Sequence, residues 1–220
     1  MSIVPQALTE SVHLAQLRLE ERSREVHRDL TDATSLHNRV QALFPDNLGP
    51  QPRAATNTLF RVEREQDGPI LLIQSTLPIN RNGLPAGYAR DIAYRDLGPL
   101  LEWGREGRVV RYRIDAHPSM SQSVPGQRGK RIPLRGEEAL QWWERQAMKA
   151  GLENQLALDI PQSDVRARRG AAKPVRYSVI RFEGVARVTD PAALRAAITS
   201  GIGRGRAYGL GLLSIAPYRS

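Results

Sequence analysis

The sequence predicts an α+β protein made of two ferredoxin-like (RRM-like) domains in tandem, with a glycine-rich loop near its C-terminus. Short apolar strands and helices of period 3.6 follow one another in the order βαββ and then βαββαβ. The 220 residues are enough for two domains of about 100 residues, each with a core. Prolines at positions 78, 85 and 99 interrupt the chain between these units. We therefore expect a first domain at 1–104 and a second at 105–220.

The first unit shows the pattern of a strand, a helix and a hairpin. Asp32 or Thr34 can cap the helix, and Leu36 and Val40 begin its apolar face. Residues from Leu77 onward give mixed signals, so a degraded last element and the linker are expected there. The elements expected in chain order are a strand at 12–19, a charged and mobile extension at 20–30, a helix that ends at Pro45, and hairpin strands at 58–63 and 70–75.

The second unit repeats this order of elements and adds a helix and a strand. Asp190 and Pro191 are typical of a helix start, with proline at its first position. Leu140, Trp143 and Ala147 share one face of a predicted helix. The elements expected are a strand at 109–114, a polar loop at 119–130, a helix at 136–150, strands at 155–160 and 177–188 joined by a basic hairpin, a helix after residue 190, and a last strand at 210–216.

Composition limits the possible functions. The absence of cysteine excludes disulfides, thiolate metal sites and a cysteine nucleophile. We find no signal peptide and no membrane span, so a cytoplasmic location without membrane contact is expected. The net charge of +9 is uneven, because residues 1–100 hold 11 basic and 12 acidic side chains and residues 101–220 hold 21 and 11. This asymmetry favours a polyanionic partner for the second half.

A run of five glycines between residues 201 and 211 is the most unusual local feature. Two arginines interrupt the run, so backbone N–H groups and positive charge could surround an anion. The alternative is a turn that packs closely on neighbouring helices. A dinucleotide site is excluded because the run follows a helix and leads into a strand. The residues predicted to bind RNA here are Gly203, Arg204, Gly205, Arg206, Gly209 and Gly211.

The remaining candidates are histidines and arginine clusters. None of His13, His27, His37 and His117 has metal-ligand spacing, so neither a metal nor another cofactor is expected. His37 lies at the border of an apolar helix face, where either a catalytic or a structural role is open. The few aromatic residues of the central strands favour recognition of structured RNA by shape and phosphate. The basic residues predicted to bind it, or else to form a solvated surface, are Arg128, Lys130, Arg131, Arg166, Arg168, Arg169 and Lys173.

Four segments together resemble the CasE family, the CRISPR-associated endoribonucleases of type I-E Cascade systems. The segments are Leu-His-Asn-Arg-Val-Gln-Ala-Leu-Phe-Pro at 36–45, Arg-Tyr-Arg-Ile-Asp-Ala-His-Pro at 111–118, Phe-Glu-Gly at 182–184, and the glycine-rich tail at 201–217. The resemblance implies two ferredoxin-like domains and metal-independent cleavage of CRISPR repeat RNA on the 3′ side of its stem-loop. It also implies that the product stays bound, that other Cascade subunits are partners, and that the free protein is a monomer.

The resemblance also implies roles for particular residues. His37 matches the family's catalytic histidine, and the hairpin at 166–173 matches an element that holds the RNA stem. Thr34 and Ala42 stand where members carry tyrosine and sometimes lysine, and His117 replaces a common asparagine. Arg39, Arg204 or Arg206 would then supply the positive charge, with Arg39 the catalytic candidate beside His37.

The chemistry expected is attack of a ribose 2′-hydroxyl on the adjacent phosphorus, leaving a 2′,3′-cyclic phosphate and a 5′-hydroxyl. A histidine of ordinary pKa, about 6.5, can act as the base or as the acid of this step. Two other functions remain open from the sequence. One is a non-catalytic subunit that binds crRNA as a scaffold, and the other is a tandem RNA-binding module associated with translation.

Overall fold

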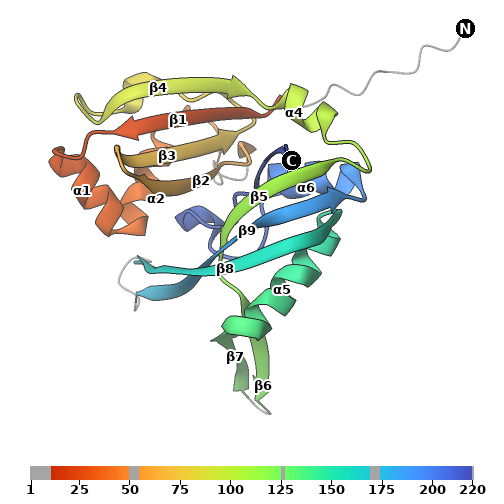
Figure 1. Cartoon of the computed structure of the whole chain (residues 1–220). Coiled ribbons are helices and arrows are strands. Elements are labelled where there is room, and N and C mark those ends of the chain that lie inside the picture. Colours follow the sequence, from red (N-terminus) through yellow and green to blue (C-terminus); the bar gives the residue numbers. More distant parts are fainter. Residues whose placement is uncertain (1–10, 50–54, 125–126, 169–173, 220) are drawn as a thin grey trace, which may run out of the picture.

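The structure is a computed structural model that describes residues 11–49, 55–124, 127–168 and 174–219. It contains two four-stranded antiparallel sheets and a separate two-stranded hairpin. Figure 1 shows the sheets as two layers, with β1 to β4 above and β5, β8 and β9 below. The predicted fold class, α+β with two ferredoxin-like units, is confirmed.

Both sheets have the ferredoxin-like strand order. The first has the order β2-β3-β1-β4 and the second the order β10-β5-β9-β8, so in each the first and third strands of the unit are central. The strands are β1 (His13–Leu19), β2 (Leu59–Glu65), β3 (Gly68–Ser75), β4 (Ala89–Asp96), β5 (Val109–Ala116), β6 (Ser119–Val124), β7 (Gln127–Pro133), β8 (Leu152–Ala167), β9 (Val175–Val188) and β10 (Ser214–Pro217).

The helices are distributed unequally between the two units. In the described part of the first crossover of the first unit, at 20–49 and 55–58, two short helices are complete, whereas the second crossover carries only a turn of 3₁₀ helix. The helices are α1 (Arg24–Thr31), α2 (Ala33–Gln41), α4 (Gly98–Trp103), α5 (Gly136–Lys149) and α6 (Pro191–Ser200), and the 3₁₀ turns are η1 (Arg81–Gly83) and η2 (Arg206–Tyr208).

The largest apolar core belongs to the second unit. Trp143 of α5 is fully buried and stacks on Phe182 of β9 with ring centroids 5.4 Å apart. Its indole Nε1 donates to the Tyr112 hydroxyl at 3.0 Å, so its polar atom is satisfied inside the core. Leu97 and Leu101, which begin and line α4, join this same core. The segment before the expected boundary at residue 104 is therefore packed against the second unit.

The prediction of a mobile extension at 20–30 is wrong, because most of this segment forms helix α1. Ser23 caps α1 by accepting from the Val26 amide, and both Val26 and Asp29 are buried. The sequence gives little helical signal there because the segment has only two apolar residues. Contacts with distant residues, described below, hold the helix in place.

Two further expectations are corrected. The polar loop predicted at 119–130 is wrong, because β6 and β7 form a hairpin that projects from the molecule at the bottom of Figure 1. Residues 77–107 hold an ordered strand, β4, which pairs with β1 along its length. Strand β4 contains no buried residue, so it does not show the alternation by which strands are detected. The basic connection after residue 160 also begins as strand, since β8 continues to Ala167.

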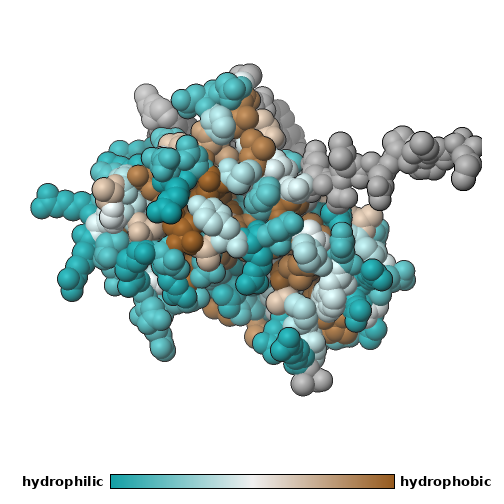
Figure 2. Space-filling model, turned by 90° about the horizontal axis from the view of Figure 1, so that it is seen from above, coloured by the Kyte–Doolittle hydropathy of each residue, from teal (hydrophilic) through white to brown (hydrophobic). Residues whose placement is uncertain are grey.

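The surface is mostly polar. Figure 2 shows hydrophilic side chains projecting around the rim of one face, with apolar patches in its middle. In the described ranges, no helix has both the length and the apolar character needed to cross a membrane.

Candidate functional site

His37 lies where the first helix pair meets the second unit. Asp32 caps α2 by accepting from the Thr34 amide at 3.2 Å. The Thr34 hydroxyl then donates to the carbonyl of Arg168 at 2.9 Å and accepts from the amide of Arg168 at 2.8 Å. This double hydrogen bond fastens the N-terminus of α2 to the chain just beyond β8. His37, one turn further along α2, therefore lies on a helix that contacts the end of β8.

Tyr208 is the nearest aromatic neighbour of His37. The two rings make a T-shaped contact with centroids 6.0 Å apart. Gly205 and Gly209 flank Tyr208 in the left-handed conformation, with φ of 78° and 85°. These glycines turn the chain so that the tyrosine faces α2. Tyr208 was not predicted as a site residue, although it is the single aromatic residue within the glycine-rich run.

Arg39 does not join His37. Residues two apart on a helix point to different sides, and the Arg39 guanidinium is held by Asp29 at 2.8 Å and by Glu25. It also lies over the ring of Tyr88, whose hydroxyl donates to Asp29 at 3.0 Å. Burial by itself would lower the pKa of Arg39, but the hydrogen bond and the charge of Asp29 raise it overall. The positive charge of Arg39 is therefore matched within the first unit.

Tyr88, which forms a cluster with Asp29 and Arg39, has a raised pKa. Burial is the largest cause, followed by the charge of Asp29 and the hydrogen bond to it. The Tyr88 hydroxyl thus stays protonated and serves as a donor to Asp29. We conclude that this cluster anchors α1 and α2 to the first sheet.

The glycine-rich loop is folded tightly on itself. Ile202 donates to the carbonyl of Gly211 at 2.9 Å, and the Gly211 amide donates to the carbonyl of Asp115 at 2.7 Å. A Cβ atom at Gly211 would lie 2.5 Å from the Ile202 carbonyl oxygen, and φ there is 84°. Glycine is required at this position for close backbone approach. The alternative interpretation of the run, as a closely packed turn, therefore describes part of it well.

The two arginines of the loop have different surroundings. Arg206 donates to the carbonyl of Ser200 at 2.8 Å, at the C-terminal end of α6. Arg204 is exposed and lines a pocket that also includes Arg131, a basic residue predicted to bind RNA, which the structure places on β7. The structure therefore brings Arg204 and Arg131 together, and it separates both from Arg39.

The other predicted basic residues are placed as follows. Arg166 lines a cavity of about 300 Å³ between the units, together with Asp29 and Tyr208. Arg168 is exposed, and its backbone carries the bonds to Thr34. Arg128 and Lys130 lie on β7, which the structure describes as a strand. The predictions for Arg169 and Lys173 fall outside the described residues.

A buried group of charges joins the two sheets beneath the loop; we call it the inter-sheet network. It comprises Arg61 and Glu63 of the first sheet and Arg113, Asp115 and Arg181 of the second. Arg61, only 2% exposed, donates to Glu63 at 2.8 Å and to the Leu212 carbonyl at 2.8 Å. Arg181 reaches Glu63 at 2.9 Å and Asp115 at 2.7 Å. The network thus ties the chain after the glycine-rich loop to both sheets.

Charge in this network shifts the pKa values of two of its members. Burial would raise the pKa of Glu63, but the surrounding Arg61, Arg181 and Arg113 outweigh it and hold the pKa below its usual range. The hydrogen bonds to Asp115 raise the pKa of Arg181. Glu63 and Arg181 therefore remain ionised at neutral pH.

Four aromatic residues of the strands, considered in the sequence for stacking on bases, are not accessible to RNA. Phe60, Tyr112, Tyr177 and Phe182 are all buried. Burial raises the pKa of Tyr112 to about 12, which keeps its hydroxyl protonated inside the second core. Recognition by bases stacked on the strands, already disfavoured by the sequence, is excluded for these four residues.

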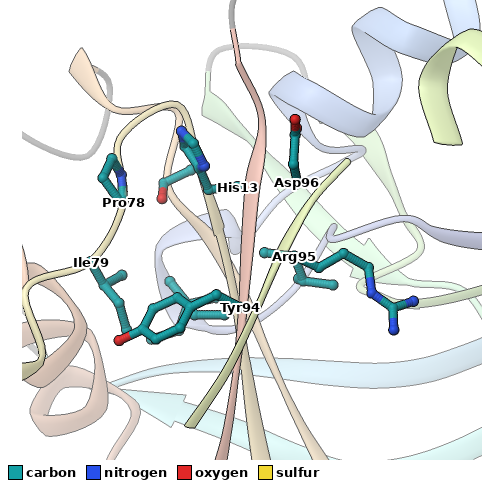
Figure 3. A pocket seen from close by; sticks show the side chains of 10 residues that line it. His13, Pro78, Ile79, Tyr94, Arg95 and Asp96 are labelled. Carbon is teal, nitrogen blue, oxygen red and sulfur yellow. The ribbon is translucent and has the colours of Figure 1, made fainter. Parts of the chain in front are cut away.

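A cavity on the first sheet stands apart from the predicted site. It has a volume of about 240 Å³ and is lined by His13, Ile79 and Tyr94 among others. Figure 3 shows the Tyr94 ring beside Ile79, with Arg95 pointing away from it. The second crossover of this unit has only η1, so Tyr94 remains 54% exposed. None of the RNA-binding or catalytic candidates lines this cavity among the residues described.

Metal-binding clusters are also absent from the part of the chain that the structure describes. No group of three or more His, Asp or Glu side chains is placed there to hold an ion. Around His37 the structure places the phenol of Tyr208 beside the imidazole, and the guanidinium of Arg166 lines the same cavity as Tyr208.

The chain is similar to two curated CRISPR-associated proteins. The CRISPR-associated endoribonuclease Cse3 of Thermus thermophilus is 29% identical over 218 residues, which cover 93% of this chain and 99% of that protein. The CRISPR system Cascade subunit CasE of Escherichia coli (strain K12) is 26% identical over 193 residues, covering 84% of this chain and 92% of that protein.

Solved structures are similar over almost the whole chain. Thermus thermophilus Cse3, bound to an RNA representing a pre-cleavage complex, has a TM-score of 0.79 at 26% identity and covers 94% of this chain and 100% of that one. A chain of a CRISPR RNA-guided surveillance complex in a pre-nicking state has a TM-score of 0.68 at 30% identity, with the same coverage. The family model described as CRISPR associated protein matches residues 12–217, and the chain belongs to this family.

Proposed function

We propose that this protein is an endoribonuclease that cuts CRISPR repeat RNA on the 3′ side of its stem-loop. It then retains the mature crRNA as a subunit of a Cascade complex. The observation that carries this proposal is the position of His37, at the point where α2, the end of β8 and the glycine-rich loop meet. Relatives similar over their whole length include a CRISPR-associated endoribonuclease and a Cascade subunit.

The reaction requires only groups that the RNA and this chain supply. A ribose 2′-hydroxyl attacks the adjacent phosphorus, the bond to the 5′-oxygen breaks, and the products are a 2′,3′-cyclic phosphate and a 5′-hydroxyl. His37 either removes the 2′-proton or gives a proton to the leaving oxygen. An imidazole whose pKa is near its usual value, about 6.5, can do either at neutral pH.

The neighbours of His37 have supporting roles in this proposal. The Tyr208 ring, in edge contact with the imidazole, limits its rotation and acts as a positioning residue. Arg39 positions α2 through Asp29, since carboxylates already hold its guanidinium. Stabilisation of the charge on the phosphorane then falls to arginines of the loop and hairpin, of which Arg204 is exposed. Loss of one well-placed donor of this kind typically costs about 3–4 kcal/mol in the transition state.

The basic elements of the unit at 105–220 hold the RNA stem, and the unit at 1–104 supplies the histidine. Cleavage removes only the 3′ flank, so the contacts with the stem remain and the product stays bound. We further propose that the protein acts in the cytoplasm and is monomeric until it joins the other subunits. A chain without cysteine fits a reducing compartment.

Cleavage by the wild type and by His37→Ala tests the proposal. Both are incubated in EDTA with a repeat hairpin RNA that carries its 3′ flank, next to an analogue with a single 2′-deoxy at the cut. We expect the wild type to cleave the hairpin RNA, and His37→Ala to cleave it about 10²-fold or more slowly. The 2′-deoxy analogue should not be cleaved by either protein. The substitution should leave the affinity for the hairpin unchanged. Tight binding without cleavage by either protein would instead identify a non-catalytic crRNA-binding subunit.

A further inference from the structure

A basic pocket lies on the second unit, beside the glycine-rich loop. It has a volume of about 380 Å³, and its walls come from the end of β5, from β7, β8 and β9, and from the loop. Its titratable and charged lining residues, apart from Tyr177, are His117, Arg131, Arg135, Asp164, Arg176 and Arg204. We refer to this site as the basic pocket.

Positive charge in the basic pocket exceeds the negative charge of its lining residues. Asp164 is the one acidic residue among its lining residues, and the guanidinium of Arg176 is paired with it. Within the described ranges, no carboxylate lies at ion-pair distance from Arg131, Arg135 or Arg204. Three guanidinium groups around one concavity repel one another unless an anion lies between them. The pocket is thus suited to a phosphate group.

His117 contributes a nitrogen to this pocket in a defined orientation. Its Nδ1 lies 2.8 Å from the carbonyl oxygen of Ser178, so this nitrogen carries the proton and donates it. The ring is 9% exposed and rests against Tyr177 in a T-shaped contact with centroids 5.4 Å apart. The fixed ring leaves Nε2 as the atom that a ligand can reach. Neutral His117 presents an acceptor there, and protonated His117 presents a second donor.

A row of aromatic rings leads from the basic pocket to His37. Tyr177 contacts Tyr208 with ring centroids 5.8 Å apart, and Tyr208 contacts His37 at 6.0 Å. The two histidines thus stand at opposite ends of two tyrosines. A single RNA strand lying along the loop could reach both ends.

We propose that the basic pocket binds a backbone phosphate of the RNA and that His117 takes up a proton when the phosphate binds. The inference rests on the proposed function, because it assumes that RNA is the ligand. A phosphate bound between His117 and the arginines would accept a hydrogen bond from Nε2–H of the protonated ring, and its negative charge would favour that form in the complex.

The sign of the pH dependence follows from the groups that face His117. These are Arg131 and Arg135 from β7 and the turn after it, Asp164 paired with Arg176, Tyr177, and Arg204 from the loop. The ligand raises the pKa of His117 in the complex above its value in the free protein. RNA therefore binds more tightly as the pH falls through neutrality, and this gain is lost above the pKa of the complex.

Binding of a repeat hairpin RNA at pH 6 and pH 8 tests this inference. The measurement is made with the full chain carrying His37→Ala and with RNA containing 2′-deoxy at the cut, so neither cleavage nor titration of His37 contributes. A rise of about one pKa unit makes binding roughly five-fold tighter at pH 6. His117→Asn, which keeps a donor for the Ser178 carbonyl, should reduce this ratio to less than about two-fold.

Arg145→Gln provides the matched control, because Arg145 is an exposed arginine of α5 outside the basic pocket. It removes one positive charge and should leave the pH ratio of the His37→Ala parent unchanged. Equal ratios in the parent and in His117→Asn would overturn the inference. If His117→Asn fails to fold, as judged by its melting curve, the NMR titration of His117 decides, and its pKa must rise when RNA binds.

The cleavage assay separates this inference from the proposed function. A protein that binds the hairpin with the expected pH dependence but does not cleave it supports the basic pocket and contradicts the nuclease. A protein that cleaves with no contribution of His117 to binding contradicts the basic pocket alone. Absence of hairpin binding at either pH would overturn both.

Discussion

The inter-sheet network and the basic pocket both depend on arginine, yet only the network contains carboxylates to match. In the network, Arg61 and Arg181 share Glu63, and Arg181 also holds Asp115. In the basic pocket, Arg176 takes the single carboxylate and the other guanidinium groups face the opening. The comparison teaches that arginine content alone does not identify a nucleic-acid surface. The position of the acidic residues decides which arginines are structural and which can bind a ligand.

Removal of the shared carboxylate should have the largest effect. Glu63→Gln leaves Arg61, which is 2% exposed, without its counter-charge in a site that water does not reach. We expect the free energy of unfolding to fall by about 3 kcal/mol, as measured by urea denaturation at pH 7. Glu65→Gln, on the exposed end of the same strand, is the control and should change it by less than about 0.5 kcal/mol. Equal effects of the two substitutions would contradict the structural role of the network.

The same variant should show a characteristic pH dependence. Because the pKa of Glu63 is lower in the folded protein, its contribution is complete above the unfolded pKa of about 4.3. The contribution is lost as the pH falls through the folded pKa. The difference in unfolding free energy between wild type and Glu63→Gln should therefore shrink below about pH 4. A difference that stays constant with acidification would show that Glu63 is not ionised in the folded protein.

Substitution of Arg39 tests whether a paired arginine of α2 contributes to stability, as the arginines of the inter-sheet network do, and not to RNA binding. Arg39→Gln deprives Asp29, 1% exposed, of its donor at 2.8 Å. We expect a loss of about 1–3 kcal/mol in unfolding free energy, with no change in the salt dependence of RNA binding. Arg24→Gln, on the exposed face of α1, is the matched control for stability. A reduced salt dependence with unchanged stability would instead place Arg39 on the RNA.

The smallest effects should come from single arginines of the basic pocket. Each of Arg131→Gln and Arg204→Gln should reduce the slope of log Kd against log salt by about 0.7–0.9, with stability unchanged. Arg113→Gln, in which the lost guanidinium was paired with Glu63 and Glu183, should leave that slope unchanged. Fluorescence anisotropy with labelled hairpin RNA over a range of salt concentrations measures all three. If all three substitutions reduced this slope equally, the arginines of the basic pocket would not differ from those of the inter-sheet network in RNA binding.

Most of the fold was predictable because it has clear periodicity. Helices α5 and α6 show apolar faces, and Asp190 and Pro191 mark the start of α6. Strand β3 has a continuous run of isoleucine and leucine, and β9 is rich in β-branched and aromatic residues. The elements that the sequence did not reveal are α1, β4 and the β6–β7 hairpin. These elements expose much of their surface or are held by polar contacts. Their sequences therefore lack the periodic apolar positions that indicate a buried face.

The candidate site was predictable in part. His37 was found from the helix pattern and from its resemblance to a family motif. Tyr208 was missed because its contact with His37 joins residues far apart in the chain. Arg39 was expected beside His37, but its true partners, Asp29 and Tyr88, lie on other elements and are invisible to spacing along one helix.

The sequence by itself determined the two ferredoxin-like units, the excess of positive charge in the second half and the histidine that we propose for catalysis. Local periodicity and composition carry the first two properties, and the resemblance of the segment around His37 to a family motif carries the third. None of them requires knowledge of spatial neighbours. Only the tertiary structure decided which arginines are neutralised, since an ion pair depends on distances of a few ångströms between residues remote in sequence. It also decided that His117 faces unpaired arginines at one end of a row of rings that reaches His37.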